Sequence, residues 1–98
     1  MGTVTGIGTS ALSAYGTMQA VAANNIANVN TDGYKPARTV LREEPRGGVS
    51  ADVEKSGDEV DISREALDMI LAKTGFKAGA KIIQADQEMQ QTLLDILA

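Results

Sequence analysis

The chain has 98 residues, a formal net charge of −4, and neither cysteine nor histidine. A chain of this length forms one domain at most and buries only about 60 to 65% of the surface that it exposes when unfolded, so a partner could complete its core. Without cysteine or histidine it lacks the usual zinc ligands, a thiolate nucleophile and the commonest proton-transfer side chain. We therefore expect no enzyme, no catalytic, metal or cofactor site, and no small-molecule substrate.

Charge and hydropathy argue against two further kinds of partner. A net negative charge argues against nucleic acid, because binding normally needs a basic face that neutralises phosphates. No uncharged apolar run reaches the length of about 18 residues that a membrane span needs. The start also lacks the basic segment of a secretory signal. If the protein leaves the cytoplasm, we expect it to keep its N-terminus.

The first predicted element is a helix that ends near Asn30. Apolar residues recur in steps of three and four between Val4 and Val29, which is typical of one helix face. Each of the glycines Gly6 and Gly8 costs about 1 kcal/mol relative to alanine inside a helix. We therefore expect the first ten residues to fray as a mobile leader.

A small β-hairpin is predicted in the middle of the chain, over residues 38–54. Short alternation of apolar and polar residues surrounds Pro45 and the two glycines Gly47 and Gly48, which predict a turn. A turn at residues 31–33 precedes the hairpin, and a polar loop follows it.

A second, longer helix is predicted from residue 62 to the end of the chain. Ile62 and Leu67 predict a hydrophobic staple around a Ser63 cap. Glu65 is placed near the start of the helix, where a negative charge interacts favourably with the helix dipole. The apolar pattern continues to Leu97, so the helix is about 50 Å long at 1.5 Å per residue. That length exceeds the diameter of a compact globule of this size, so we expect a long partner helix.

These elements predict one mainly α domain that covers residues 1–98. It comprises an N-terminal helical segment (1–30), a turn, hairpin and polar loop (31–61), and a C-terminal helix (62–98). The two helices are expected to pack as a coiled-coil-like pair or to be exchanged between chains. Gly75 and Gly79 would let another backbone approach closely, and plain tolerance of glycine is the alternative.

A row of lysines lies on the second predicted helix, at positions 73, 77 and 81. Residues at this spacing share one helix face, and like charges there mildly destabilise an isolated helix. A solvated face is the usual explanation, and a contact with an acidic neighbour is the alternative.

The end of the first predicted helix carries a motif that can be matched to a known family. The stretch "ANNIANVNTDGYKPAR" resembles the N-terminal signature of the bacterial flagellar axial proteins, the rod, hook and hook-associated group. The matching residues are Ala23, Asn24, Asn25, Ile26, Ala27, Asn28, Asn30, Thr31, Gly33, Tyr34 and Lys35.

The C-terminal half resembles the same family independently. The stretch "EVDISREALDMILAKTGFKAGAKIIQADQEMQQTLLDIL" is similar to the tail of basal-body rod proteins, above all the proximal-rod type. Two departures stand out: Gly79 replaces an asparagine that the family pattern has between two alanines, and no large middle domain is present. The residues of this half that the resemblance places at an assembly interface are Phe76, Ala80, Ile83, Met89, Leu93, Leu94 and Leu97.

The resemblance implies a structural, self-assembling subunit of the flagellar basal-body rod, whose terminal helices pack as the inner layer of a hollow tube. Asn24, Asn25 and Asn28 would lie between subunits and fix one register, as single polar residues do in helix seams. Capping of a helix end is the alternative role of these amides.

The resemblance also implies partners and a location. The partners are other copies of the chain, other rod and hook subunits, and the flagellar export machinery. The location is the basal body, which the protein would reach from the cytoplasm without a cleaved signal peptide. A soluble helical adaptor or chaperone-like binding module with the same terminal motifs is the alternative function.

Overall fold

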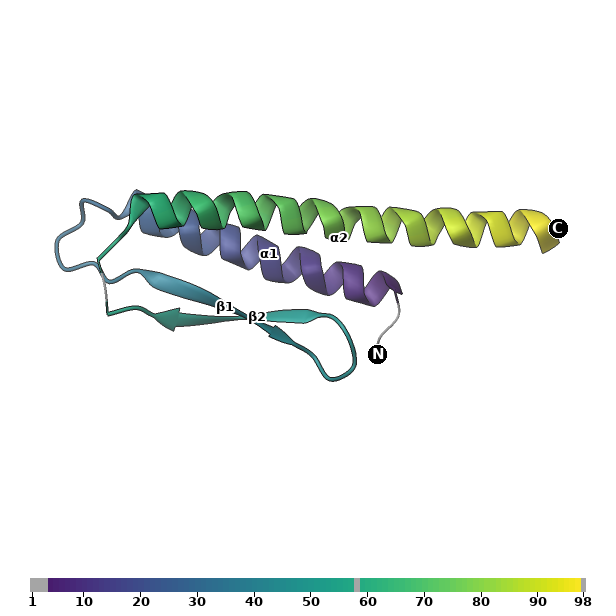
Figure 1. Cartoon of the computed structure of the whole chain (residues 1–98), viewed down its shortest axis with the longest axis horizontal. Coiled ribbons are helices and arrows are strands. Elements are labelled where there is room, and N and C mark those ends of the chain that lie inside the picture. The colour runs from purple at the N-terminus through teal and green to yellow at the C-terminus, as the bar shows by residue number, and fades with distance from the viewer. Residues whose placement is uncertain (1–3, 58, 98) are drawn as a thin grey trace.

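The structure, a computed structural model, describes residues 4–57 and 59–97. Residues 1–3, 58 and 98 of the predicted segments lie outside this description. Two antiparallel helices lie side by side with a β-hairpin next to them (Figure 1). The elements are α1 (Val4–Ala27), β1 (Ala37–Glu43), β2 (Val49–Lys55) and α2 (Ile62–Leu97). The mainly helical fold with a small hairpin between two long helices is therefore confirmed.

Helix α1 is regular from Val4 onward, so the predicted mobile leader is wrong for the described residues. The reason is tertiary packing, because Gly8 is buried against α2. A Cβ placed at Gly8 would lie 2.6 Å from Cγ1 of Ile83 and 3.0 Å from the carbonyl oxygen of Gly79. Glycine thus weakens α1 in isolation but permits the contact that stabilises it in the fold.

Small residues fill the seam between α1 and α2. The core side chains Ala14, Ala22 and Ala72 are almost fully buried. A Cβ at Gly79 would meet Cβ of Ala11 at 3.0 Å, and a Cβ at Gly75 would overlap the ring of Tyr15. The predicted close helix packing at the two α2 glycines is therefore confirmed, with α1 of the same chain as the partner.

The hairpin forms where the alternation predicted it. Strands β1 and β2 pair antiparallel, from Ala37 opposite Lys55 to Glu43 opposite Val49. Its turn is closed by a hydrogen bond of 2.9 Å from the Gly47 amide to the Glu44 carbonyl. Both turn glycines have φ near +94°, which side chains disfavour. The hairpin packs against α1, which lies between it and α2 (Figure 1).

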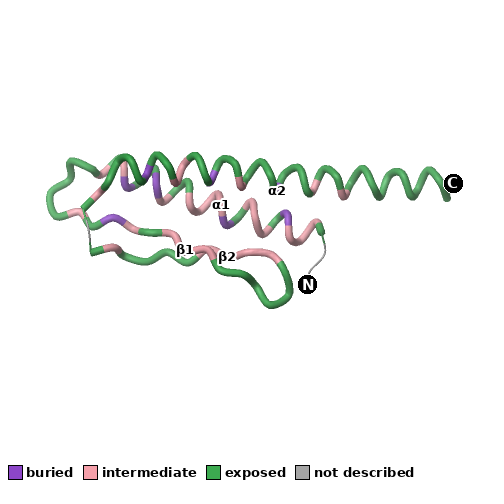
Figure 2. The backbone as a smooth tube through the Cα atoms, in the orientation of Figure 1, coloured by how far each residue is buried: buried purple, intermediate pink, exposed green. Residues whose placement is uncertain are grey.

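Helix α2 extends beyond the start of α1, and the molecule is 63 Å long and 23 by 14 Å across. Thr5 near the start of α1 donates a hydrogen bond to the Asp86 carboxylate, so residues 87–97 project past α1 as an overhang. These 11 residues span about 16 Å. The overhang is exposed on every side (Figure 2). Its large apolar side chains, Met89, Leu93, Leu94, Ile96 and Leu97, are 54–81% exposed.

Neither described helix is long and apolar enough to cross a membrane.

Candidate functional site

Asn25 in the last turn of α1 is the centre of a buried polar cluster. Its side chain is fully buried, and its Nδ2 donates to the Ala37 carbonyl at 2.7 Å and to Oε2 of Glu65 at 2.8 Å. Its Oδ1 accepts from the Tyr34 hydroxyl at 2.8 Å and from the Ala37 amide at 3.0 Å. A primary amide offers two donor hydrogens and two acceptor lone pairs, so this amide is fully used within one chain.

Glu65 reaches the cluster from the first turn of α2 and is only 7% exposed. The polar end of its side chain accepts the hydrogen bond from Asn25, in the first turn of the helix, where the helix dipole is positive. Three chain segments that are distant in sequence, the end of α1, the start of β1 and the start of α2, therefore meet at one amide.

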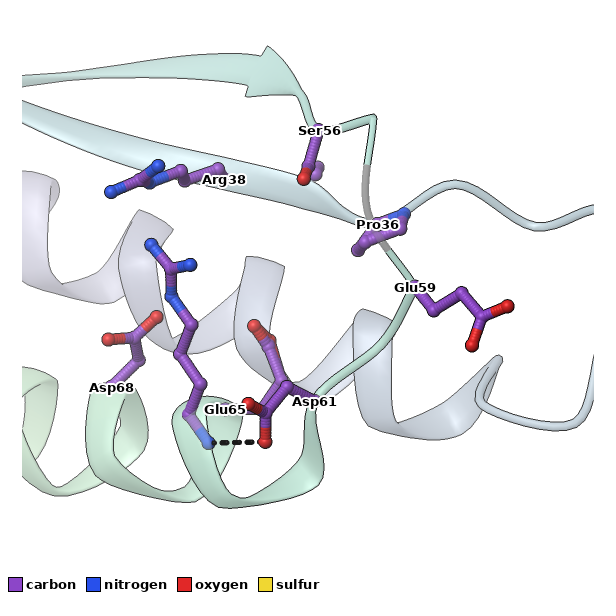
Figure 3. A pocket seen from close by; sticks show the side chains of 9 residues that line it. Pro36, Arg38, Ser56, Glu59, Asp61, Glu65 and Asp68 are labelled. Carbon is purple, nitrogen blue, oxygen red and sulfur yellow. Dashed lines mark hydrogen bonds between the residues drawn. The ribbon is translucent and has the colours of Figure 1, made fainter.

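The cap of α2 is Asp61, and the predicted Ser63 cap is wrong. The helix begins at Ile62, so Ser63 lies inside its first turn. An Asp61 side-chain oxygen accepts from the Arg64 amide at 3.2 Å, drawn as the dashed line in Figure 3. Aspartate and serine are comparable caps by preference. The register that places Glu65 against Asn25 also places Asp61 at the cap position.

Asn28 caps the end of α1 locally. Its Nδ2 donates to the Asn24 carbonyl at 2.9 Å, and its Oδ1 accepts from the Thr31 hydroxyl at 3.1 Å. The chain then turns at Gly33, which has a positive φ of 73°. This geometry corresponds to the capping alternative for Asn28.

Tyr34 connects the exposed part of the motif to the buried cluster. Its hydroxyl donates to Asn25 and accepts from Nδ2 of Asn24 at 3.2 Å. The ammonium of Lys55 lies 5.9 Å from the centre of the Tyr34 ring, within the range of a cation–π contact. The motif tyrosine therefore links the end of α1 to the end of the hairpin.

Ser10 holds the opposite end of the hairpin, and no pattern in the sequence predicted this role. Its hydroxyl donates to the Ile7 carbonyl at 2.7 Å and accepts from the Val49 amide at 3.1 Å. Ser10 and Asn25 are 15 residues apart, a rise of about 22 Å along a helix. The seven residues of β1, from Ala37 to its end, make six steps that span about 20 Å. The two polar anchors on α1 thus match the length of the hairpin.

An open cleft of about 230 Å³ lies beside the buried cluster, and Figure 3 shows its lining. It carries both signs of charge, with Arg38 and Arg64 facing a set of carboxylates. The acidic lining residues are Glu59, Asp61, Glu65 and Asp68. Within the described part of the chain, no group of three or more potential ligands could hold a metal ion.

The structure gathers the N-terminal motif into one region but spreads the C-terminal residues along α2. Of the motif, Asn25 is buried, three residues are half-buried (Ile26, Asn28 and Tyr34), and the others are exposed: Ala23, Asn24, Ala27, Asn30, Thr31, Gly33 and Lys35. On α2, Ile83 lies against Gly8, whereas Phe76, Ala80, Met89, Leu93, Leu94 and Leu97 are exposed. Placement between subunits stays a prediction for the exposed residues, while the Asn25 amide is already satisfied inside the chain.

Two family models match the two ends of the chain. The model described as flagella basal body rod protein matches residues 7–35, which include most of α1 and the motif. The model described as flagellar basal body rod FlgEFG protein C-terminal matches residues 53–96, which include nearly all of α2. No curated protein matches the chain.

Proposed function

Since the chain belongs to the flagellar rod and hook family, we propose that it is a self-assembling subunit of the basal-body rod that polymerises through its terminal helices. Both matching families are structural parts of the rod and not enzymes, which supports a structural role for the protein in the flagellar basal body. Its partners in this proposal are further copies of itself and other rod or hook subunits.

The observation that carries this proposal is the uncovered overhang of α2. Five large apolar side chains at residues 89–97 are more than half exposed, although α1 covers the preceding part of the same helix. Burial of one such side chain contributes about 1.5 to 3 kcal/mol. A partner that covers all five therefore gains enough free energy to hold a subunit in an assembly.

The motif at the end of α1 provides a second candidate contact surface. Asn24 and Asn30 are exposed, and so is Lys35, beside the fixed cluster around Asn25. In our proposal Asn24 and Asn28 set the register between subunits, and Asn25 holds the loop that presents them. The cluster would thus act on assembly through the shape of the loop.

The short hairpin supports a position like that of the proximal-rod proteins. Only residues 36–52 separate the two matched regions, and β1 and most of β2 fill that interval. Hook and distal-rod proteins carry a large surface domain there, so the hairpin favours a proximal-rod type over a hook type. We further propose that the flagellar export machinery delivers the chain without cleavage of a signal peptide.

Sedimentation velocity across a wide range of concentrations tests the self-assembly. We expect the weight-average sedimentation coefficient to rise with concentration, alone or with other rod subunits, because the overhang becomes covered. A monomer at every concentration under both conditions would instead favour the adaptor or chaperone-like module. In motile bacteria, loss of the protein should abolish the rod and motility, and the wild-type chain should restore both.

A further inference from the structure

Helix α2 presents two apolar stripes in addition to the seam that packs on α1. The first, which we name the outer stripe, comprises Leu71, Ala78, Ile82, Met89 and Ile96. The second, which we name the flanking stripe, comprises Ile62, Ala66, Met69, Phe76 and Ala80. Spacings of three, four and seven residues place each set on one face of the helix. Within the described chain, α1 buries Ala72 and Gly79 between the stripes and leaves most of both stripes exposed.

Opposite charges border these stripes. Lys73 and Lys77 lie along the far side of the flanking stripe, in the middle of α2, and both are exposed. Glu88 and Asp95 follow Lys77 on the same helix face, opposite α1 and near the end of α2, and this face also borders the far side of the outer stripe. These two carboxylates accept hydrogen bonds from the neutral residues Gln84 and Gln91. Among the described residues, none of the four charged side chains has an ion-pair partner.

The charge at the end of α2 is unfavourable for an isolated helix. The last turn carries no basic residue, although Asp95 lies close to the negative end of the helix dipole. Cations stabilise such an end and anions destabilise it. A cationic surface supplied by another chain would relieve this repulsion.

We propose that α2 of one copy packs in parallel on α2 of the next, with the outer stripe of one against the flanking stripe of the other. When the two helices pack in parallel, the far side of the outer stripe of one copy lies next to the far side of the flanking stripe of the other. Glu88 and Asp95 of one copy therefore lie over the lysines of the next. The inference rests on the proposed function, since it names the contact through which copies assemble.

The spacing of the charges defines the stagger of the two copies. Glu88 and Asp95 are seven residues apart, and the lysine row from Lys73 to Lys81 spans eight. A shift of about 13 residues, or about 20 Å along the helix, sets Glu88 of one copy between Lys73 and Lys77 of the next and brings Asp95 to the level of Lys81. The same shift places Met89 next to Phe76 of the neighbour, a favourable sulfur–aromatic pair.

Two different faces of the same helix meet in this contact, so the contact is heterologous. Each copy that offers its outer stripe still has a free flanking stripe, and the contact can repeat. A two-fold dimer would instead use the same surface on both partners and would stop at two copies. The proposed contact therefore predicts open-ended growth and explains the lysine row as a contact with an acidic neighbour.

Charge reversal tests the polar part of the contact. We expect Lys77→Glu and Glu88→Lys each to raise the concentration needed for assembly by at least about tenfold, because like charges then face each other. An equimolar mixture of the two variants should restore assembly, since each supplies the charge that the other has lost. Arg46→Glu in the hairpin turn makes the same change in net charge as Lys77→Glu, but away from the contact, and should assemble like wild type.

Cysteine cross-linking tests the apolar part, and the chain has no natural cysteine to interfere. Positions 76 and 89 are about 20 Å apart along one helix, so they cannot form a disulfide within a chain. Phe76→Cys combined with Met89→Cys should give a ladder of covalent oligomers after mild oxidation. Each single variant should stay uncross-linked.

The outcomes separate this inference from the proposed function. Assembly that is insensitive to charge reversal, together with no covalent ladder, would overturn the contact but leave self-assembly in place. Dimers from Met89→Cys alone would overturn it in favour of a two-fold contact. A wild-type chain that never assembles, alone or with other rod subunits, would overturn both. Unchanged circular dichroism of the variants shows that these exposed substitutions leave the fold intact.

Discussion

Asn25 and Glu65 are 40 residues apart in the sequence and share a buried hydrogen bond of 2.8 Å from Nδ2 to Oε2. The bond joins the last turn of α1 to the first turn of α2, and the same amide also holds the first residue of β1. One side chain therefore fixes both helices and the hairpin relative to each other, at the centre of the motif that identifies the family.

Asn25→Leu should destabilise the monomer by about 3 kcal/mol or more. The substitution removes four hydrogen bonds and leaves the buried Glu65 carboxylate without its partner, which costs about 1 to 3 kcal/mol for each unsatisfied group. Urea unfolding followed by circular dichroism measures the change. Asn24→Leu is the matched control, since Asn24 is exposed and should cost less than about 1 kcal/mol. Equal losses would contradict a folding role specific to Asn25.

Gly79→Asn, which restores the family's residue, should destabilise this chain by about 1 to 3 kcal/mol. Any side chain at this position meets Ala11 and the Gly8 backbone at 3.0 Å, and overpacking of this kind is costly. The neighbouring Ala78→Asn, on an exposed site, provides the control in the same thermal melts. Gly16→Ala has open space and should stabilise the helix by up to about 1 kcal/mol. A stabilised Gly79→Asn variant would show that the helices can move apart without loss.

Asp61→Ala should cost about 1 kcal/mol of stability, whereas Ser63→Ala should cost close to nothing. The Asp61 carboxylate caps α2, and removal of an N-cap side chain typically has this effect. Chemical unfolding of the two variants beside wild type gives the comparison. The reverse order would mean that Ser63 caps α2, as the sequence pattern alone predicted.

Ser10→Ala should loosen the turn end of the hairpin and leave its other end in place. The Val49 amide loses its acceptor, at a cost of about 1 kcal/mol, while the contacts of Ala37 with Asn25 remain. Hydrogen exchange should accelerate at Val49 more than at the amides near Lys55. Ser13→Ala, on the exposed side of α1, should leave both rates unchanged.

Deletion of residues 92–98, of which Ala98 lies outside the described structure, should abolish assembly and leave a folded, helical monomer. Residues 92–97 lie beyond the start of α1, so the monomer core does not need them. If these apolar residues belonged to a monomer core, their removal would cost more free energy than the marginal stability of a small domain, and the chain would unfold. Circular dichroism of the truncated chain measures whether it stays helical, and sedimentation measures whether it still assembles. A chain that loses its helical signal at every concentration would place these residues in an intramolecular core.

The sequence by itself determined the elements and the excess of apolar surface. Steps of three and four apolar residues predicted both helices, and alternation around Pro45 predicted the hairpin, because these patterns depend only on local geometry. The length of the second predicted helix indicated in advance that it needs a long partner helix.

Only the tertiary structure decided the roles of individual residues. Gly8 lies in a regular helix because Ile83 and Gly79 approach it, and Asp61 rather than Ser63 caps α2 because Glu65 must reach Asn25. Ser10 became an anchor because the Val49 amide lies 3.1 Å from its hydroxyl. Each of these roles depends on a partner that is distant in the sequence. A hydrogen bond or a close backbone contact needs a specific position in space, and local periodicity does not encode that position.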